Sequence, residues 1–247
     1  MKDQRGWKLK IGSVIPSTNT IVQPDFDDLR LEGITNHIAR ISIPNMDIKN
    51  DSDFDKMVRL SEGNLVAAVD RLQTSEPGII IVGMSSLIVW DGYDSSIQRK
   101  KMLEERTGVP VTGGSFAVAD ALQRFGIKKI AILSPYMPIA DKHITQFFTD
   151  SGFHIQKFVG LRCPSPVSIS YVGTEEITSA IDEIDSPDTE AIVQFGTNLH
   201  FMQQAAIEEK KRGKPVISIN AASYWHALRL SGIDTKYPNY GRLLAEF

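Results

Sequence analysis

IIIVGMSSLIVWDG, residues 79–92, starts with four consecutive apolar residues and then passes into glycine and serine before a second apolar run. A short apolar run of this kind is typical of a strand that is buried on both faces of a parallel sheet. Binding and catalytic side chains are concentrated in the loops that follow such strands. We therefore expect residues 84–87 to lie at a functional site.

A second stretch repeats this pattern. AIVQFGTNL, residues 191–199, is again an apolar run followed by glycine, a hydroxyl residue, a polar residue and leucine. Further similar segments follow in the same order, which indicates a chain of two similar halves. The alternative is that all α/β proteins share such strand, turn and helix patterns, but the common order favours duplication. The further pairs are residues 12–17 and 131–136, 108–111 and 213–216, and 121–127 and 227–233.

The alternation of apolar runs with amphipathic stretches predicts an α/β protein with parallel sheets covered by helices on both faces. We expect one half to comprise residues 1–113 plus 221–247 and the other residues 114–220, with the crossing at the Gly113-Gly114 pair. The predicted strands are 8–15, one within 34–43, one beginning at 79, 109–112, 129–134, 154–159, 191–195 and 215–219. The predicted helices are 22–29, 53–73, 93–107, one ending at 125, 139–150, 174–184, 200–212 and one ending at 230, with a tail at 238–247.

Composition excludes several classes of protein. The chain has 247 residues, 42% hydrophobic, which is enough for a large core, and a net charge of −3, which gives no basic field for nucleic acid. It has no apolar run of about 20 residues and no apolar signal segment at its start, so we expect a cytoplasmic protein without a membrane partner. One cysteine excludes an internal disulfide. We expect Cys163 to be an inert, partly buried thiol; the alternative is a pKa lowered by Arg162.

Ligands of parallel sheets bind beyond the carboxyl ends of the strands. This rule brings residues 16–20, 84–87, 135–136 and 196–198 into one cleft. These loops carry hydroxyl, amide and glycine residues but no lysine or arginine. Such groups suit a carboxylate or an enolate that is held by neutral hydrogen bonds.

Motifs for cofactors are missing from the sequence. No glycine-rich nucleotide motif follows a strand, and the five histidines show no metal-ligand spacing, so we expect neither cofactor nor metal. His200 follows the second loop and is interpreted as a water-facing residue, or else as a general acid or base. Tyr136 is either a cleft wall or a hydroxyl donor. We expect His226 to be a packing residue on a helix, and Asp91 or Asp94 and Asn220 or Ser223 to cap helices.

The chain resembles the aspartate/glutamate racemase superfamily, most closely its arylmalonate decarboxylase and maleate cis-trans isomerase branch. The resemblance covers nearly the whole chain and implies two pseudo-symmetric Rossmann-like (flavodoxin-like) α/β/α domains. Each domain has a four-stranded parallel sheet, and the active site lies between them. The segments that carry the resemblance are residues 14–20, 83–92, 133–136, 196–199, 215–218, 225–232 and 240–244.

The sequence departs from this family at two positions. Racemases and isomerases of the group use two facing cysteines, and the decarboxylases keep the second; here these positions fall on Met84 and Gly196. Chemistry that depends on those thiols is therefore not carried over. The resemblance does imply a carboxylate site formed by Pro16, Asn19, Ser85, Ser86, Tyr136, Gly196, Thr197 and Asn198.

Three functions remain open at this point. The first is a cofactor-independent decarboxylase, lyase or isomerase that stabilises an enediolate without a cysteine acid/base, with Ser85, Tyr136 and His200 as candidate proton donors. The second is a catalytically silent protein that binds or senses a carboxylate. The third is a hydrolase or hydratase that uses Ser85 or a bound water, for which a His-Asp relay is missing. All three imply a small carboxylic acid as partner, and the sequence leaves a homo-oligomer open.

Overall fold

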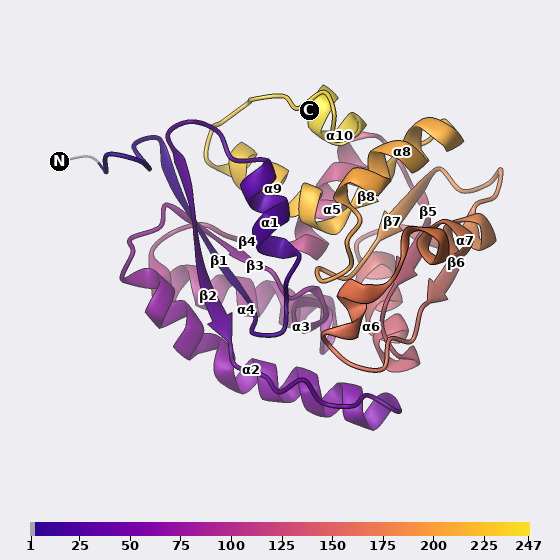
Figure 1. Ribbon diagram of the computed structural model, residues 1–247, viewed down its shortest axis with the longest axis horizontal. Helices are drawn as coiled ribbons and strands as arrows, with labels where there is room; N and C mark the ends of the chain where they lie inside the picture. Colours follow the sequence, from indigo (N-terminus) through magenta and orange to yellow (C-terminus); the bar gives the residue numbers. More distant parts are fainter. Residues whose placement is uncertain (1–2) are drawn as a thin grey trace.

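The computed structural model describes residues 3–247 and contains two four-stranded parallel sheets, which occupy opposite sides of the molecule (Figure 1). Their strand orders are β2-β1-β3-β4 and β6-β5-β7-β8, so the second sheet repeats the first. The predicted fold class is thereby confirmed. The strands are β1 (Leu9–Pro16), β2 (Ile34–Ile41), β3 (Ile79–Val82), β4 (Val111–Gly113), β5 (Lys129–Ser134), β6 (His154–Gly160), β7 (Ala191–Gln194) and β8 (Val216–Ser218).

Helices cover these sheets. Helix α9 contacts β3 and β4 of the first sheet and also β8 of the second, so it links the two halves. The division at residues 113 and 221 stays a prediction. The helices are α1 (Val22–Asp28), α2 (Asp51–Gln73), α3 (Ser85–Val89), α4 (Gly92–Thr107), α5 (Gly114–Arg124), α6 (Pro138–Asp150), the 3-10 helix η1 (Ser168–Tyr171), α7 (Thr174–Ile184), α8 (Met202–Arg212), α9 (Ile219–Leu230) and α10 (Arg242–Glu246).

Strand register places the functional loops at one edge of each sheet. Val82 of β3 pairs with Val14 of β1 and with Gly113 of β4, close to where all three strands end. In the second sheet Gln194 pairs with Leu133 and with Ser218 in the same way. All four residues of β3 are buried, as an apolar strand covered on both faces requires. The loops after the strands therefore leave from common edges.

Some predicted local features are wrong. Residues 85–89 form the short helix α3 rather than a loop, and α10 forms within the predicted tail. Asn220 and Ser223 cap nothing, because α9 begins at Ile219 and both side chains are buried inside it. Asp91 stands at the start of α4 but makes no capping hydrogen bond, since its carboxylate pairs with Arg59 at 2.6 Å. Within residues 3–247, no helix has the length and apolar character needed to cross a bilayer.

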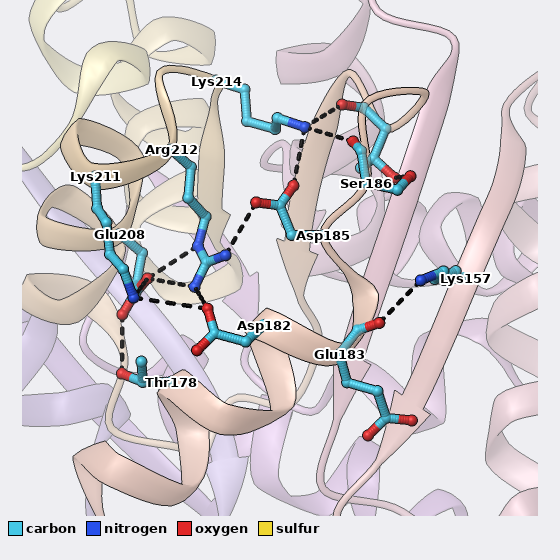
Figure 2. Close-up of polar contacts among 11 residues, drawn as sticks. Lys157, Thr178, Asp182, Glu183, Asp185, Ser186, Glu208, Lys211, Arg212 and Lys214 are labelled. Carbon is cyan, nitrogen blue, oxygen red and sulfur yellow. Dashed lines mark hydrogen bonds and ion pairs between the residues drawn. The ribbon is translucent and has the colours of Figure 1, made fainter.

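An ion-pair network around the buried side chains of Arg212 and Glu208 joins α7 to α8 (Figure 2). The Arg212 guanidinium, only 5% exposed, bonds Glu208 at 2.8 Å, Asp182 at 2.6 Å and Asp185 at 3.0 Å. Lys214 joins the network through Asp185 at 2.9 Å. Although burial opposes it, hydrogen bonds from Thr178 and Arg212 lower the pKa of Glu208, so its buried carboxylate stays charged.

Arg212→Ala is expected to lower the free energy of unfolding by about 3 kcal/mol, because it leaves the Glu208 carboxylate buried without its ion-pair partner. Urea denaturation measures this change. Lys211→Ala is the matched control: Lys211 is 52% exposed and contacts the same Glu208, at 4.0 Å, so its loss should cost less than about 1 kcal/mol. Equal costs for the two variants would show that burial does not set the strength of this network.

Candidate functional site

A cavity lies where the strand ends of the two sheets face each other. Its volume is about 490 Å³, including space open to solvent. A cavity of this size suits a small ligand. The first half contributes Pro16, Thr18, Asn19, Ile43, Ile48, Phe54, Met57, Met84 and Ser86, and the second half Pro135, Tyr136, Cys163, Ser165, Pro166, Ile169, Thr197 and Asn198.

The polar wall of the cavity is formed by Ser86, Tyr136, Thr197 and Asn198. The hydroxyl of Tyr136 lies at its centre. It lies 3.1 Å from Ser85 Oγ and also bonds the Ser86 side chain and the Thr197 backbone N–H. Burial raises the pKa of Tyr136 to about 12, although these hydrogen bonds oppose the shift. The phenol is therefore neutral at physiological pH. It joins the loop after β3 to the loop after β7, one from each half.

Amide side chains at the cavity hold the two halves together. Asn19 Nδ2 donates to Thr197 Oγ1 at 3.2 Å, and the Thr197 hydroxyl donates to the Gly83 carbonyl at 2.9 Å. The Asn198 side chain accepts from the Thr20 N–H at 2.9 Å and donates to the Pro166 carbonyl at 2.9 Å. These side chains have partners within the protein. The two asparagine amides therefore hold the loops of the two halves in place.

Apolar side chains form much of the remaining lining, which we call the apolar wall. Ile43, Ile48, Phe54, Met57 and Ile169 line it, and Met84 adds a thioether. Among the lining residues that the structure describes, none carries a charge. An acid in this cavity would contact both neutral donors and hydrocarbon, and an ionised group against the hydrocarbon would have no counter-ion.

The structure brings most of the predicted site residues together. Pro16, Asn19, Met84, Ser86, Tyr136, Thr197 and Asn198 line the cavity, and Ser85 contacts it through Tyr136. His200 is exposed and does not line the cavity, so its interpretation as a proton donor is not supported and the water-facing alternative is correct. His226 stacks on Trp225 and bonds Thr112 at 2.6 Å, which is the packing role expected of it.

Gly196 is held in a conformation that only glycine adopts readily. Its φ is +135°, and a Cβ atom here would lie 2.5 Å from Pro135 Cδ. Any side chain at this position requires the β7 loop to move. The position that the resemblance aligns with a family cysteine therefore has no space for a thiol in this chain.

Cys163 is the inert, buried thiol that the sequence predicts, but its place at the cavity was not predicted. The residue is 8% exposed and lines the cavity, and its N–H donates to the Pro135 carbonyl at 2.9 Å. Burial raises its pKa to about 11, so the alternative of an Arg162-activated thiolate is wrong. The Arg162 guanidinium instead bonds the Tyr136 carbonyl at 2.6 Å and Asp141. Cys163 comes just after a predicted strand of the second half, and this position could have indicated that it lies at the cavity.

The chain is similar to known arylmalonate decarboxylases and maleate isomerases. A family model described as arylmalonate decarboxylase matches residues 11–244. The maleate isomerase of Alcaligenes faecalis is 23% identical over 252 residues, 96% of either chain. The arylmalonate decarboxylase of Bordetella bronchiseptica is 25% identical over 179 residues, 71% of this chain and 75% of its own.

Solved structures share the fold. The maleate cis-trans isomerase of Nocardia farcinica bound to TRIS superposes with a TM-score of 0.89 at 18% identity, covering 96% of this chain and 98% of its own. An arylmalonate decarboxylase crystal structure gives a TM-score of 0.75 at 21% identity, covering 95% of this chain and 98% of its own. At these identities the likeness establishes the two-sheet architecture.

Proposed function

Because the chain belongs to the arylmalonate decarboxylase family, we propose that it is a cofactor-independent enzyme that acts on a small carboxylic acid as a lyase or an isomerase. One observation carries the proposal: neutral donors from both halves converge on the Tyr136 hydroxyl in an enclosed cavity. Donors fixed in this way favour an oxyanion over a neutral group, because they need not reorganise when charge develops.

In the proposed reaction, a carboxylate of the substrate binds to the Ser86 and Tyr136 hydroxyls and to the Asn198 N–H. A neighbouring carboxylate leaves as carbon dioxide when its bond to the α-carbon breaks, and the electron pair of that bond forms an enediolate on the bound carboxylate. The Tyr136 hydroxyl then gives its proton to the α-carbon, and water restores that proton. The Ser85 Oγ is hydrogen-bonded to the Tyr136 hydroxyl at 3.1 Å and helps to orient it.

We favour decarboxylation over isomerisation because of the apolar wall. A carboxylate placed against Ile43, Ile48 and Phe54 loses its hydration and gains no counter-ion, and loss of carbon dioxide relieves that cost. Isomerisation of a dicarboxylate keeps both charges to the end of the reaction. The substrate class that fits best is thus a malonic acid with an apolar substituent.

The test is a panel assay. Phenylmalonate and alkylmalonates are tested for release of carbon dioxide, and maleate for conversion to fumarate. Turnover of the malonates is the expected result. If every acid raises the melting temperature but none is turned over, the protein is a carboxylate-binding protein, since ligand binding alone stabilises by RT ln(1 + [L]/Kd).

Cys163→Ser is expected to change kcat by less than about threefold, because the proposed proton donor is Tyr136. The replacement puts a hydroxyl of similar size in place of the thiol, so packing is largely preserved. The kcat for phenylmalonate measures the effect. A loss of about a hundredfold or more would assign proton transfer to the Cys163 thiol and would contradict this part of the mechanism.

A further inference from the structure

A buried carboxyl group lies behind the polar wall and has no role in the reaction as described so far. Asp25 on α1 is 2% exposed and Asn220 on α9 is 1% exposed. The Asn220 Nδ2 donates to Asp25 Oδ2 at 2.8 Å and to the Thr197 carbonyl at 3.0 Å. Asp25 is therefore connected to a cavity loop through one side chain.

The Asn220 amide sets the orientation of a particular peptide group. In a planar trans peptide the C=O of one residue and the N–H of the next point in opposite directions. Because Asn220 holds the Thr197 carbonyl from the side of α9, the Asn198 N–H points away from α9. Asn198 lines the cavity and Asn220 does not, so this peptide presents a donor on the side of the polar wall.

The amide of Asn220 has a second possible orientation. Its Oδ1 is buried and has no hydrogen-bond partner, so only its two acceptors, Asp25 and the Thr197 carbonyl, fix it as observed. A protonated Asp25 becomes a donor, and the free acceptor next to it is that oxygen. Rotation of the amide to meet this donor would take Nδ2 away from the Thr197 carbonyl.

We propose that Asp25 is a positioning residue, whose ionised carboxylate orients the Asn220 amide and thereby holds the Thr197–Asn198 peptide in place to bind the acid. The proposal rests on the proposed function for the identity of the ligand. Burial raises the pKa of Asp25 to about 7, the Asn220 hydrogen bond opposes the shift, and Asp28 on the same helix adds to it. No other charged group that the structure describes acts on Asp25 to a comparable extent. The peptide is therefore expected to be held more firmly above pH 7 than below it.

Asp25→Asn tests the proposal. In the unsubstituted protein, kcat for phenylmalonate should rise with pH through an inflection near 7. In Asp25→Asn the inflection should disappear and kcat at pH 8 should fall about tenfold, with the melting temperature not lowered. Asp28→Asn is the control: Asp28 is exposed and bonds Gln203, so kcat should stay and the inflection should move slightly to lower pH. An unchanged kcat and pH profile in Asp25→Asn would overturn the proposal while leaving the proposed function intact.

A binding measurement separates the two proposals. The increase in melting temperature caused by phenylmalonate is recorded from pH 5 to pH 9 in both variants and in the unsubstituted protein. If no protein shows turnover but this increase grows through pH 7 and loses that dependence only in Asp25→Asn, the positioning role stands and the enzymatic function fails. If this increase depends on pH in the same way in all three proteins, Asp25 has no positioning role.

Discussion

Tyr136→Phe is expected to lower kcat by about 100- to 1,000-fold, which makes it the most damaging single replacement at the site. The change removes a hydroxyl that serves as oxyanion donor and as proton donor, and loss of one such donor costs a factor of this size in other enzymes. The ring itself keeps its contact with Phe54, at 5.1 Å between centroids, so the cavity should keep its shape. Steady-state kinetics with phenylmalonate measures the effect.

A matched control comes from the same half of the molecule. Tyr171 is 76% exposed, and Tyr171→Phe should leave kcat and KM unchanged. Differential scanning calorimetry of both variants would show whether either one unfolds early. If Tyr136→Phe raises KM and leaves kcat unchanged, the hydroxyl binds the substrate but contributes nothing specific to the transition state, and the proposed proton donor is wrong.

Asp25→Asn is expected to stabilise the protein at pH 8 by as much as about 4 kcal/mol. The pKa of Asp25 is raised by burial from 3.8 to about 7, so ionisation is more costly in the folded state than in the unfolded state. Below pH 4 both states carry the proton and the cost is zero. As the pH rises from 4 to 7, only the unfolded state gives up its proton, so folding stability falls and the full cost is present above 7. Asparagine has the same shape and no charge, and thus avoids this cost.

Thermal denaturation at pH 4 and pH 8 checks this expectation. The variant should melt about 10 °C above the unsubstituted protein at pH 8, and the two should converge at pH 4. Asp28→Asn serves as the control, because an exposed carboxylate should give only a small difference at either pH. Equal melting temperatures at pH 8 would mean that the Asn220 hydrogen bond compensates the buried charge.

These results would together describe a trade between stability and function. A buried carboxylate that costs folding free energy is retained next to a cavity loop, and replacement should make the protein more stable and less active. Such costs are typical of positions that serve an active site. A carboxylate retained for packing alone would give a stabilised variant with unchanged kinetics.

Much of the fold was predictable because local patterns report burial directly. The apolar runs at residues 79–82 and 191–194 are strands buried on both faces, and the repeat of their surroundings correctly indicated two equivalent sheets. The family inferred from the motifs is confirmed by the match over residues 11–244. Helix α3 was missed because five residues are too few to show a helical period.

The site was predictable only at the level of loops. The ends of parallel strands identified the segments that meet, and Ser86 and Asn198 do line one cavity. The direction of individual side chains was not predictable. His200 follows a site loop yet faces solvent, whereas Cys163 lies in a segment that was assigned no function and faces the cavity.

The sequence by itself determined that two duplicated parallel α/β halves bring uncharged loops to a shared edge, because strand burial and strand ends are encoded in short stretches of neighbouring residues. Only the tertiary structure decided which groups act together there. Asp25 and Asn220 are 195 positions apart, and Asn19 and Thr197 are 178 apart. Contacts between residues so far apart in the sequence depend on how the two sheets and α9 pack against each other. That packing cannot be predicted from the pattern of neighbouring residues.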